Sequence, residues 1–350
     1  MFTRHHVPFI ELNKRGFDTG FVSIRGYHFD EVIEDNDLII FTRVYNTDPF
    51  RHIWRFKSEG KKIIYELDDD VWNIPAVNPA HNTFKIKKDE VTDMCLEADA
   101  IIVSTEALAE TIKALPRMGN KPIFVCPNAV NRDMFKPRQK QKRDRVRIGW
   151  AGGGNHYEDL DELLDVWLEI DKKYDVEFII QGLTGTPLEA EMFNKAQTLK
   201  RGSVTDKATK EYMETALRVW DKVKQLKNFQ HIPFYPAEMY PSVLTNCDFD
   251  IGIAYTTKHK FNASKSCIKF YEYAAVGTPT MASFNPPYKN EVSYTAKDKK
   301  EWVEKLSRLV ESEELREKVL KEQQEYVFNN REISVVGDIW EQTYEKINKL

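Results

Sequence analysis

Short apolar runs alternate with amphipathic helical stretches along most of this 350-residue chain, and this alternation restricts the possible folds severely. Neighbouring parallel strands need a crossover between them, which is usually a helix, so parallel sheets produce such a pattern. The sequence therefore predicts an α/β protein. The predicted strands span residues 37–42, 62–67, 100–104 and 122–126 in the first half, and 147–150, 176–181, 229–232, 250–254 and 278–282 in the second.

The chain is too long for one ordinary core, and its length suits two domains. Residues 136–147 separate the halves, because they carry many cations and no apolar periodicity. These cations indicate either a solvated hinge or a basic rim that attracts a polyanionic acceptor. The predicted units are residues 1–143, residues 144–330 with a helical insertion at about 184–227, and a last helix at 331–350.

Composition excludes few classes of function. The formal net charge is −4, which gives no global reason to expect nucleic acid. The four cysteines are scattered, which favours buried reduced thiols over disulfides or a metal site. No apolar run approaches the roughly 18–20 residues that span a bilayer, and the N-terminus does not resemble a signal peptide. A soluble, cytoplasmic protein is therefore expected, and its oligomeric state stays open.

Residues 258–283 (KHKFNASKSCIKFYEYAAVGTPTMAS) are the most informative segment for function. A loop with Lys265 and Ser266 runs into a short predicted helix that carries Lys269 and Glu272 and stops at Gly277. Cations and free backbone N–H groups at a helix start suit a phosphate. A carboxylate one turn further along can accept hydrogen bonds from two sugar hydroxyls. This combination favours a nucleotide-sugar.

A second phosphate-site pattern opens the second domain, where a strand is followed by Gly152, Gly153 and Gly154 and then by a helix. We expect these glycines to allow close approach to a ligand and positive φ angles. Glu158 and Asp159 in the first helical turn would repel a phosphate there. His156 offsets that charge if its imidazole faces the ligand, and otherwise it is a turn residue exposed to solvent.

Three consecutive aspartates, Asp68, Asp69 and Asp70, follow a predicted strand of the first domain. Open α/β sheets bind ligands at the carboxyl ends of their strands, so at least one of these side chains is expected at the ligand. Metal binding, helix capping and hydrogen bonding to sugar hydroxyls are the open alternatives. No further set of metal ligands is evident in the sequence.

Together these stretches resemble the GT-B glycosyltransferases, whose two Rossmann-like domains face each other across a cleft, and within them the family-four retaining group, including a bacterial and phage-like subgroup. The resemblance runs from about Asp37 to the last helix. It is most specific in PNAVNRDMF at residues 127–135 and KSCIKFYEYAAVGTPTMAS at residues 265–283. It implies that the last helix crosses back onto the first domain.

The resemblance also implies roles for individual residues. Glu272 would bind the ribose hydroxyls, and Lys265, Ser266 and Lys269 would hold the pyrophosphate. The turn Gly152, Gly153, Gly154 and Asn155 would lie beside it. No cofactor and no divalent metal would be required, because the nucleotide-sugar is itself a substrate.

The chain departs from the family pattern at several positions. Ser264 stands where the family has the first of two paired glutamates, and Asn155 and His156 stand where it has an Arg/Lys pair. Leu67 and Asp68 stand where a histidine is common. The N-terminal sequence MFTRHHVPFIEL also differs from the usual first strand and glycine loop.

The predicted function is transfer of a glycosyl group from a nucleotide-sugar to an acceptor hydroxyl, with retention. Asp68, Asp70 and His156 are the candidate catalytic residues. The acceptor stays open between a glycan, a lipid-linked sugar and a hydroxylated base of phage DNA. The alternatives are an epimerase or hydrolase of the same fold, a non-catalytic nucleotide-sugar-binding module, and a metal-dependent transferase that uses the aspartates.

Overall fold

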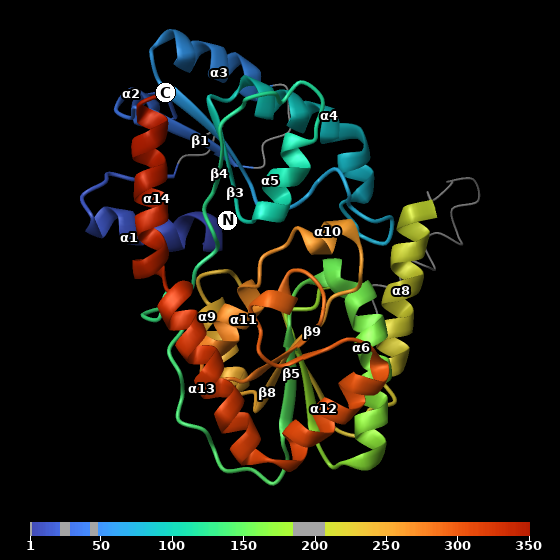
Figure 1. Ribbon diagram of the computed structural model, residues 1–350. Coiled ribbons are helices and arrows are strands. Elements are labelled where there is room, and N and C mark those ends of the chain that lie inside the picture. Colours follow the sequence, from blue (N-terminus) through green and yellow to red (C-terminus); the bar gives the residue numbers. More distant parts are fainter. Residues whose placement is uncertain (1, 22–28, 43–47, 185–206) are drawn as a thin grey trace.

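The computed structural model of the chain describes residues 2–21, 29–42, 48–184 and 207–350. Two α/β domains lie one above the other, and the last helix reaches back from the lower domain to the upper one (Figure 1). The first part of the predicted insertion at 184–227 falls outside the described residues. Its second part is a helix, as predicted.

The upper domain is built on a four-stranded parallel sheet with the order β1-β2-β3-β4. The strands are β1 (Leu38–Thr42), β2 (Lys62–Leu67), β3 (Ala100–Val103) and β4 (Ile123–Val125). The central strands are buried on both faces, which explains the continuous apolar runs in the sequence. All four predicted strands are confirmed.

Helices pack on this sheet through their apolar faces. They are α2 (Phe29–Glu34), α3 (Asp48–Ser58), α4 (His81–Glu97) and α5 (Glu106–Lys113). Ile53 and Phe56 of α3 are fully buried in the same core as Ile63 of β2. α5 begins after Thr105, whose hydroxyl oxygen accepts a hydrogen bond of 3.1 Å from the Leu108 N–H. Thr105 is therefore the N-cap of α5.

No strand precedes β1 in the part of the chain that is described. A π-helical turn η1 (Phe2–His6) and helix α1 (Val7–Lys14) come first, and α1 packs against the last helix, α14 (Ile333–Asn348). One apolar cluster joins Val7, Ile64 and Trp340, so α14 completes the core of the upper domain. The resemblance predicted this return.

Not every apolar residue of α14 is buried. Ile339 is 40% exposed. The buried positions follow the spacing of a helical stripe, and Ile339 lies just outside it. These buried positions are Ile333, Val336, Trp340, Tyr344 and Ile347.

The lower domain is built on a six-stranded parallel sheet with the order β10-β9-β8-β5-β6-β7. The strands are β5 (Arg147–Ala151), β6 (Glu177–Gln181), β7 (Phe229–Ile232), β8 (Ile251–Ala254), β9 (Thr280–Ser283) and β10 (Thr295–Ala296). The first five confirm predicted strands. β10 was missed because two residues are too few to carry a periodic pattern.

Longer and shorter helices connect these strands. They are η2 (Gly154–His156), α6 (Tyr157–Lys173), α8 (Lys207–Val223), α9 (Tyr240–Cys247), α10 (Lys260–Ala263), α11 (Ile268–Ala275), η3 (Tyr288–Asn290), α12 (Lys299–Glu311) and α13 (Glu313–Asn330). α6 buries Leu160, Leu163 and Trp167 against the sheet, as its spacing predicts. α8 packs on α6 and buries Val219 and Trp220.

The described chain passes between the domains near Val130 and returns near Glu332, and these two crossings pair with each other. The Val130 N–H donates to the Arg331 carbonyl at 2.9 Å, and the Ile333 N–H donates to the Val130 carbonyl at 2.9 Å. Both crossings therefore lie at the same side of the molecule, which is the left side in Figure 1.

The basic run 136–147 has no regular structure before β5 begins at Arg147. It descends along the lower domain to the amino ends of the strands (Figure 1). Lys140 and Arg143 form ion pairs there with Asp248, which precedes β8. A basic rim at the ligand was therefore wrong for this part of the run, since the strands' carboxyl ends lie at the opposite edge.

α10 lies between the two domains and forms one of the contacts between them (Figure 1). Its Phe261 is 4% exposed and belongs to the apolar cluster of the upper domain, together with Ile101 and Leu108. The carboxyl ends of both sheets meet the segment that contains this helix. A side chain of the lower domain thus completes the core of the upper one.

Two predictions about composition were also tested. All four cysteines are buried and unpaired, as expected. Among the described residues, none of the helices combines the length and the apolar character needed to cross a bilayer.

Candidate functional site

The predicted glycine turn lies at the carboxyl end of β5. Gly152 and Gly154 are needed because a side chain would clash with neighbouring atoms, and not because the backbone has positive φ angles. None of the three has a positive φ angle. A Cβ on Gly152 would lie 2.6 Å from the Trp150 indole and 3.2 Å from Lys269 Nζ. Gly152 is therefore needed to let Lys269 approach the strand end.

Gly154 faces a different neighbour. A Cβ there would lie 2.7 Å from Thr184 Oγ1 and 3.1 Å from the Tyr212 hydroxyl. Gly154 is buried toward the chain that follows β6, away from Lys269. Asn155 is exposed, and no hydrogen bond joins it to another described residue of the site. The structure thus brings Gly152 to the site and leaves Gly154 and Asn155 beside it.

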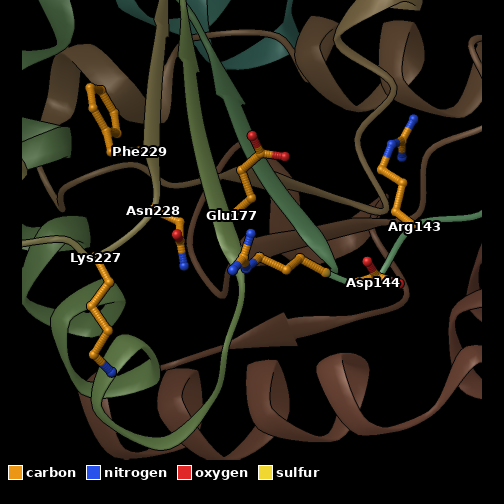
Figure 2. Close-up of a pocket in the computed structure, with 7 residues that line it drawn as sticks. Arg143, Asp144, Glu177, Lys227, Asn228 and Phe229 are labelled. Carbon is orange, nitrogen blue, oxygen red and sulfur yellow. The ribbon is translucent and has the colours of Figure 1, made fainter.

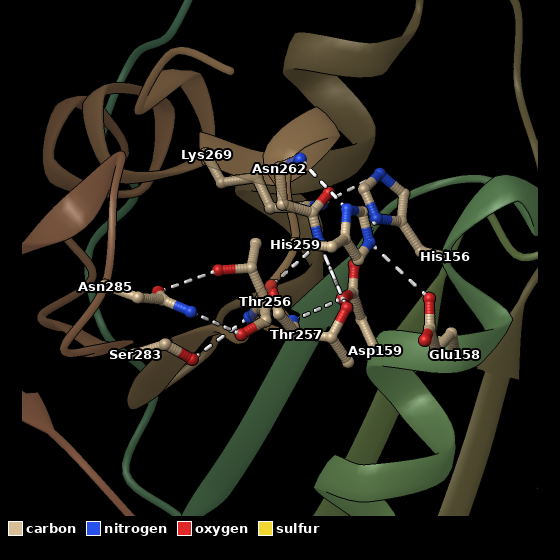
Figure 3. A network of polar contacts seen from close by, with 10 residues as sticks. All are labelled: His156, Glu158, Asp159, Thr256, Thr257, His259, Asn262, Lys269, Ser283 and Asn285. Carbon is tan, nitrogen blue, oxygen red and sulfur yellow. Dashed lines mark hydrogen bonds and ion pairs between the residues drawn. The ribbon is translucent and has the colours of Figure 1, made fainter. Parts of the chain in front are cut away.

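His156 and Asp159 form a buried pair at the start of α6 (Figure 3). His156 Nδ1 lies 2.7 Å from Asp159 Oδ2, and only 13% of the histidine side chain is exposed. Burial, with the nearby charges of Lys269 and Lys265, lowers the pKa of His156 to about 3. The imidazole is therefore neutral, and it donates its Nδ1–H to the carboxylate.

The carboxylate of Asp159 is bound by hydrogen bonds from within the protein. Its Oδ1 accepts hydrogen bonds from the Thr257 N–H at 2.7 Å, the Thr257 hydroxyl at 3.0 Å and Asn262 Nδ2 at 3.3 Å. Burial raises its pKa, but hydrogen bonding and attraction to His156 prevail, and the pKa falls to about 2. The predicted repulsion of phosphate by Asp159 is therefore offset within the protein.

Glu158, the other acid of this turn, is also engaged. Its Oε2 lies 3.5 Å from His259 Nε2, and His259 Nδ1 accepts from the Asn262 N–H at 3.2 Å. Sequence reasoning did not find Thr257 or Asn262. Thr257 lies just before the segment 258–283 and Asn262 lies within it, but the pattern assigned neither a role, and only the packing of α6 against this segment brings them to Asp159.

Lys269 is the cation at the centre of this arrangement. Its Nζ lies 3.4 Å from His156 Nε2 and 5.0 Å from the centroid of the Trp150 ring. No described carboxylate forms an ion pair with it. Burial and the neighbouring charge of Lys265 lower the pKa of Lys269 to about 8. Asp159 and Glu272 attract this charge from a greater distance, so the ammonium is charged at neutral pH but has no described carboxylate in direct contact, which suits an anionic ligand.

Glu272 lies one turn after Lys269 on α11, as predicted, but it is more buried than expected. Only 6% of the residue is exposed, and its Oε2 accepts a hydrogen bond of 2.8 Å from the Tyr240 hydroxyl. Burial raises the pKa of Glu272 to about 7. No described residue donates a hydrogen bond to Oε1. The carboxyl group thus keeps one oxygen for a ligand.

The loop 264–266 carries the predicted donor residues and also contacts the upper domain. The Thr105 hydroxyl donates to the Ser264 carbonyl at 2.7 Å, and the Ser264 hydroxyl lies 3.4 Å from Asp70 Oδ2. Asp70 is 1% exposed, and both its oxygens accept from Asn73 Nδ2. Burial raises the pKa of Asp70. Asp70 therefore faces Ser264, the residue at which the chain departs from the glutamate of the resembling family.

Ser266 makes the second contact of this loop. Its hydroxyl oxygen accepts a hydrogen bond of 2.7 Å from Asn128 Nδ2, and the same nitrogen lies 3.3 Å from Asp68 Oδ1. Asn128 is 2% exposed. The structure thus places Asn128 between Asp68 and the loop 264–266.

Lys265 completes the predicted donor set. Its Nζ lies 4.6 Å from the centroid of the Phe261 ring, and its charge acts on both His156 and Lys269. No group of three or more His, Cys, Asp or Glu side chains among the described residues is arranged to hold a metal ion. Asp68 and Asp70 have the separate partners given above.

A hollow of about 440 Å³ lies at the opposite edge of the lower sheet (Figure 2). It is lined by Arg143, Asp144, Arg145, Glu177, Lys227, Asn228 and Phe229. Its arginines are occupied: Arg143 forms an ion pair with Asp248, and Arg145 Nε lies 2.7 Å from Asp175. Paired cations attract an anion weakly, so this hollow is a poor candidate for the functional site.

The two parallel-sheet domains, joined by a C-terminal helix that returns to the first, define a GT-B fold. Solved structures with this fold are similar to the chain over most of its length. A sucrose-phosphate synthase from Thermosynechococcus elongatus has a TM-score of 0.61 at 11% identity, covering 91% of this chain and 76% of that one.

Two further structures illustrate the range of this similarity. A glycosyltransferase from Rickettsia africae ESF-5 has a TM-score of 0.59 at 13% identity, covering 97% of this chain and 88% of that one. An alpha-glucosyltransferase in complex with UDP-glucose and DNA containing an abasic site has a TM-score of 0.61 at 10% identity, covering 93% and 84%. No protein-family model and no curated protein match the sequence.

Proposed function

We propose that the chain is a glycosyltransferase that takes its sugar from a nucleotide-sugar. The observation that carries this proposal is Lys269, a half-buried ammonium without a carboxylate partner at the strand ends that face the other domain. A GT-B fold alone would not suffice, because one fold hosts several functions. The position of Glu272 one helical turn away supports a nucleotide rather than a simple phosphate.

In the proposed complex, Lys269 and Lys265 hold the pyrophosphate and Ser266 donates a hydrogen bond to it. Glu272 accepts hydrogen bonds from the ribose hydroxyls through Oε1. His156 is neutral, and its Nε2 lies 3.4 Å from Lys269, so we assign it the role of orienting that ammonium. A pKa of about 3 makes it a poor proton acceptor at neutral pH.

Transfer breaks the bond between the sugar and the nucleoside diphosphate and forms a bond to the acceptor oxygen. Negative charge develops on the departing phosphate, and Lys269 and Lys265 stabilise it. We propose retention through a front-face displacement, in which the departing phosphate takes the acceptor proton, as the resemblance to the family-four enzymes implies. This route needs no divalent metal and no cofactor.

Asp68 and Asp70 are proposed to act from the upper domain. Asp70 faces Ser264, so it can supply the carboxylate that this position lacks and bind a sugar hydroxyl. Asp68 is half-buried beside Ser266 and is proposed to orient the acceptor hydroxyl. The acceptor is proposed to be a glycan, a lipid-linked sugar or a hydroxylated DNA base. Buried thiols support work in a reducing compartment such as the cytoplasm.

A screen of nucleotide-sugars by thermal shift tests the proposal, starting with UDP-glucose because a structural neighbour binds it. The best donor is then incubated with each acceptor class, and products are identified by mass spectrometry. We expect stabilisation by one donor and transfer to one acceptor. No stabilisation by any nucleotide-sugar would refute the proposed site.

The same assay separates the alternative functions. Free sugar or an epimer formed from the donor alone would identify a hydrolase or an epimerase. Stabilisation without any turnover across the acceptor classes would favour a non-catalytic binding module. Loss of turnover in excess chelator would favour a metal-dependent transferase.

A further inference from the structure

Arg4 is a buried cation in the N-terminal segment, far in sequence from the predicted site. It is 2% exposed, although its guanidinium is charged. Its Nε donates to Glu66 Oε1 at 2.6 Å, and its Nη1 donates to the Cys126 carbonyl at 2.5 Å and to Asn128 Oδ1 at 3.1 Å. The Trp340 ring of α14 lies 4.8 Å away. Arg4 thus joins β2, the end of β4 and the last helix.

The partner of Arg4 is equally buried. Glu66 on β2 is 0% exposed; burial raises its pKa, but the charge of Arg4 and contact with His5 prevail and lower it to about 2. A buried ion pair gains little stability over apolar residues of the same volume, because both charges must be desolvated. A gain in stability therefore does not explain well why Arg4 and Glu66 are buried as an ion pair.

The pair determines which way the amide of Asn128 faces. A guanidinium can only donate, so the atom of Asn128 next to Arg4 must be the oxygen. The amide nitrogen is thereby directed to the other side, where it lies 2.7 Å from Ser266 Oγ and 3.3 Å from Asp68 Oδ1. The Asp68 carboxylate can only accept and favours the same orientation from the other side, at 3.3 Å, while Arg4 holds the amide oxygen at 3.1 Å.

We propose that Arg4 is a positioning residue, which orients Asn128 so that its amide nitrogen bridges Asp68 of the upper domain and Ser266 of the donor loop. This role rests on the proposed function, since it assigns Asp68 and Ser266 to the reacting groups. It also gives the N-terminal helical segment a function at the site, in a chain with no strand before β1 among its described residues.

A double-mutant cycle tests the proposal on the full chain. Arg4→Lys keeps the charge but loses the planar set of donors that reaches Glu66, Cys126 and Asn128 together. Asn128→Ala removes the bridge. We expect each variant to lower kcat about tenfold with little change in donor affinity, and the double variant to be no worse than Asn128→Ala alone.

Arg15→Lys is the matched control. Arg15 also joins the N-terminal segment to α14, through Asp338 and Glu341, but it does not touch Asn128. We expect unchanged kcat, with a smaller fall in thermal stability than in Arg4→Lys because these acids are more exposed than Glu66. Equal losses of kcat in Arg15→Lys and Arg4→Lys, or additive losses in the cycle, would overturn the positioning role.

A crystal structure of Arg4→Lys decides the question without an activity assay. We expect the Asn128 side chain to turn, so that its nitrogen no longer reaches Ser266 Oγ. An unchanged Asn128 would overturn the proposal. If the native chain transfers no sugar but Asn128 turns in the variant, the proposed function fails while the positioning role of Arg4 toward Asn128 stands.

Discussion

The two edges of the lower sheet both carry dense charge, yet they differ in how that charge is paired. At the amino edge, Arg145 and Arg147 each contact a carboxylate within 2.7 Å. At the carboxyl edge, Lys269 contacts a neutral imidazole, and the nearby carboxylate of Asp159 is used by Thr257 and Asn262. A cation without a paired carboxylate therefore identifies an anion-binding site better than a large number of cations does.

The difference has an energetic basis. An exposed ion pair gains about 0–1 kcal/mol and gives up little when solvent replaces one partner. A half-buried ammonium without a counterion is already desolvated, and an incoming phosphate recovers that cost. We therefore expect an anion to bind at the carboxyl edge rather than at the amino edge.

The largest effect is expected from Lys269→Ala. Removing a hydrogen bond to a charged group costs about 1.5–3 kcal/mol, so affinity for a nucleoside diphosphate should fall about 10- to 100-fold. Isothermal titration calorimetry measures this loss. Unchanged affinity would show that the unpaired ammonium is not the anion site.

Glu272→Gln should weaken donor binding less than Lys269→Ala does, and it should raise the stability of the fold at pH 8. An amide binds ribose hydroxyls less strongly than a carboxylate, so affinity should fall about fivefold. The folded pKa of about 7 lies above the ordinary value, so the ionised form costs stability above pH 7. We expect a higher Tm than the native chain at pH 8 and a smaller difference at pH 5, measured by calorimetry. A lower Tm at pH 8 would contradict this account.

The pH dependence of donor affinity should show both groups. Below pH 7 Glu272 becomes neutral, and above pH 8 Lys269 loses its proton, so affinity should be highest between these values. A decline of about threefold to tenfold is expected by pH 6 and by pH 9. Lys269→Arg should remove the alkaline decline alone, and its persistence in that variant would assign the decline to another group.

The smallest effect is expected at the amino edge. Arg145→Ala breaks an exposed ion pair with Asp175, so donor affinity should not change and stability should fall by at most about 1 kcal/mol. Chemical denaturation and the same calorimetric titration measure both quantities. A clear loss of affinity would remove the contrast between the two edges.

The sequence predicted the strands because most of them are apolar runs that the sheet buries, as β2, β3 and β8 are. It also predicted Lys269 and Glu272, because both lie on one short helix and their spacing sets their relative position. Asn128 and Arg4 could not be found in this way. They meet Ser266 and Asp68 only through the tertiary fold, and their own sequence contexts indicate a turn and a helix.

Asp159 shows a different limit of sequence reasoning. An acid in the first turn of a helix after a glycine run suggests repulsion of a phosphate. The structure buries this acid and surrounds it with donors from the segment after β8, so its charge is largely satisfied. Burial and hydrogen bonding decide the effect of a charge, and neither can be read from neighbours in the sequence. Gly152 and Gly154 show the same limit. Neither has a positive φ angle, and both are required because neighbouring side chains leave no room for a Cβ.

The paired crossings at Val130 and Glu332 also limit how the two domains can move. Two chain segments joined by backbone hydrogen bonds cannot slide past each other or twist separately without breaking those bonds. We therefore expect them to act as a hinge between the domains, with a single axis at one side of the molecule. A rotation about this axis would move Phe261 and the loop 264–266 away from the upper domain together, so the proposed donor residues and the apolar contact between the domains would separate in one motion.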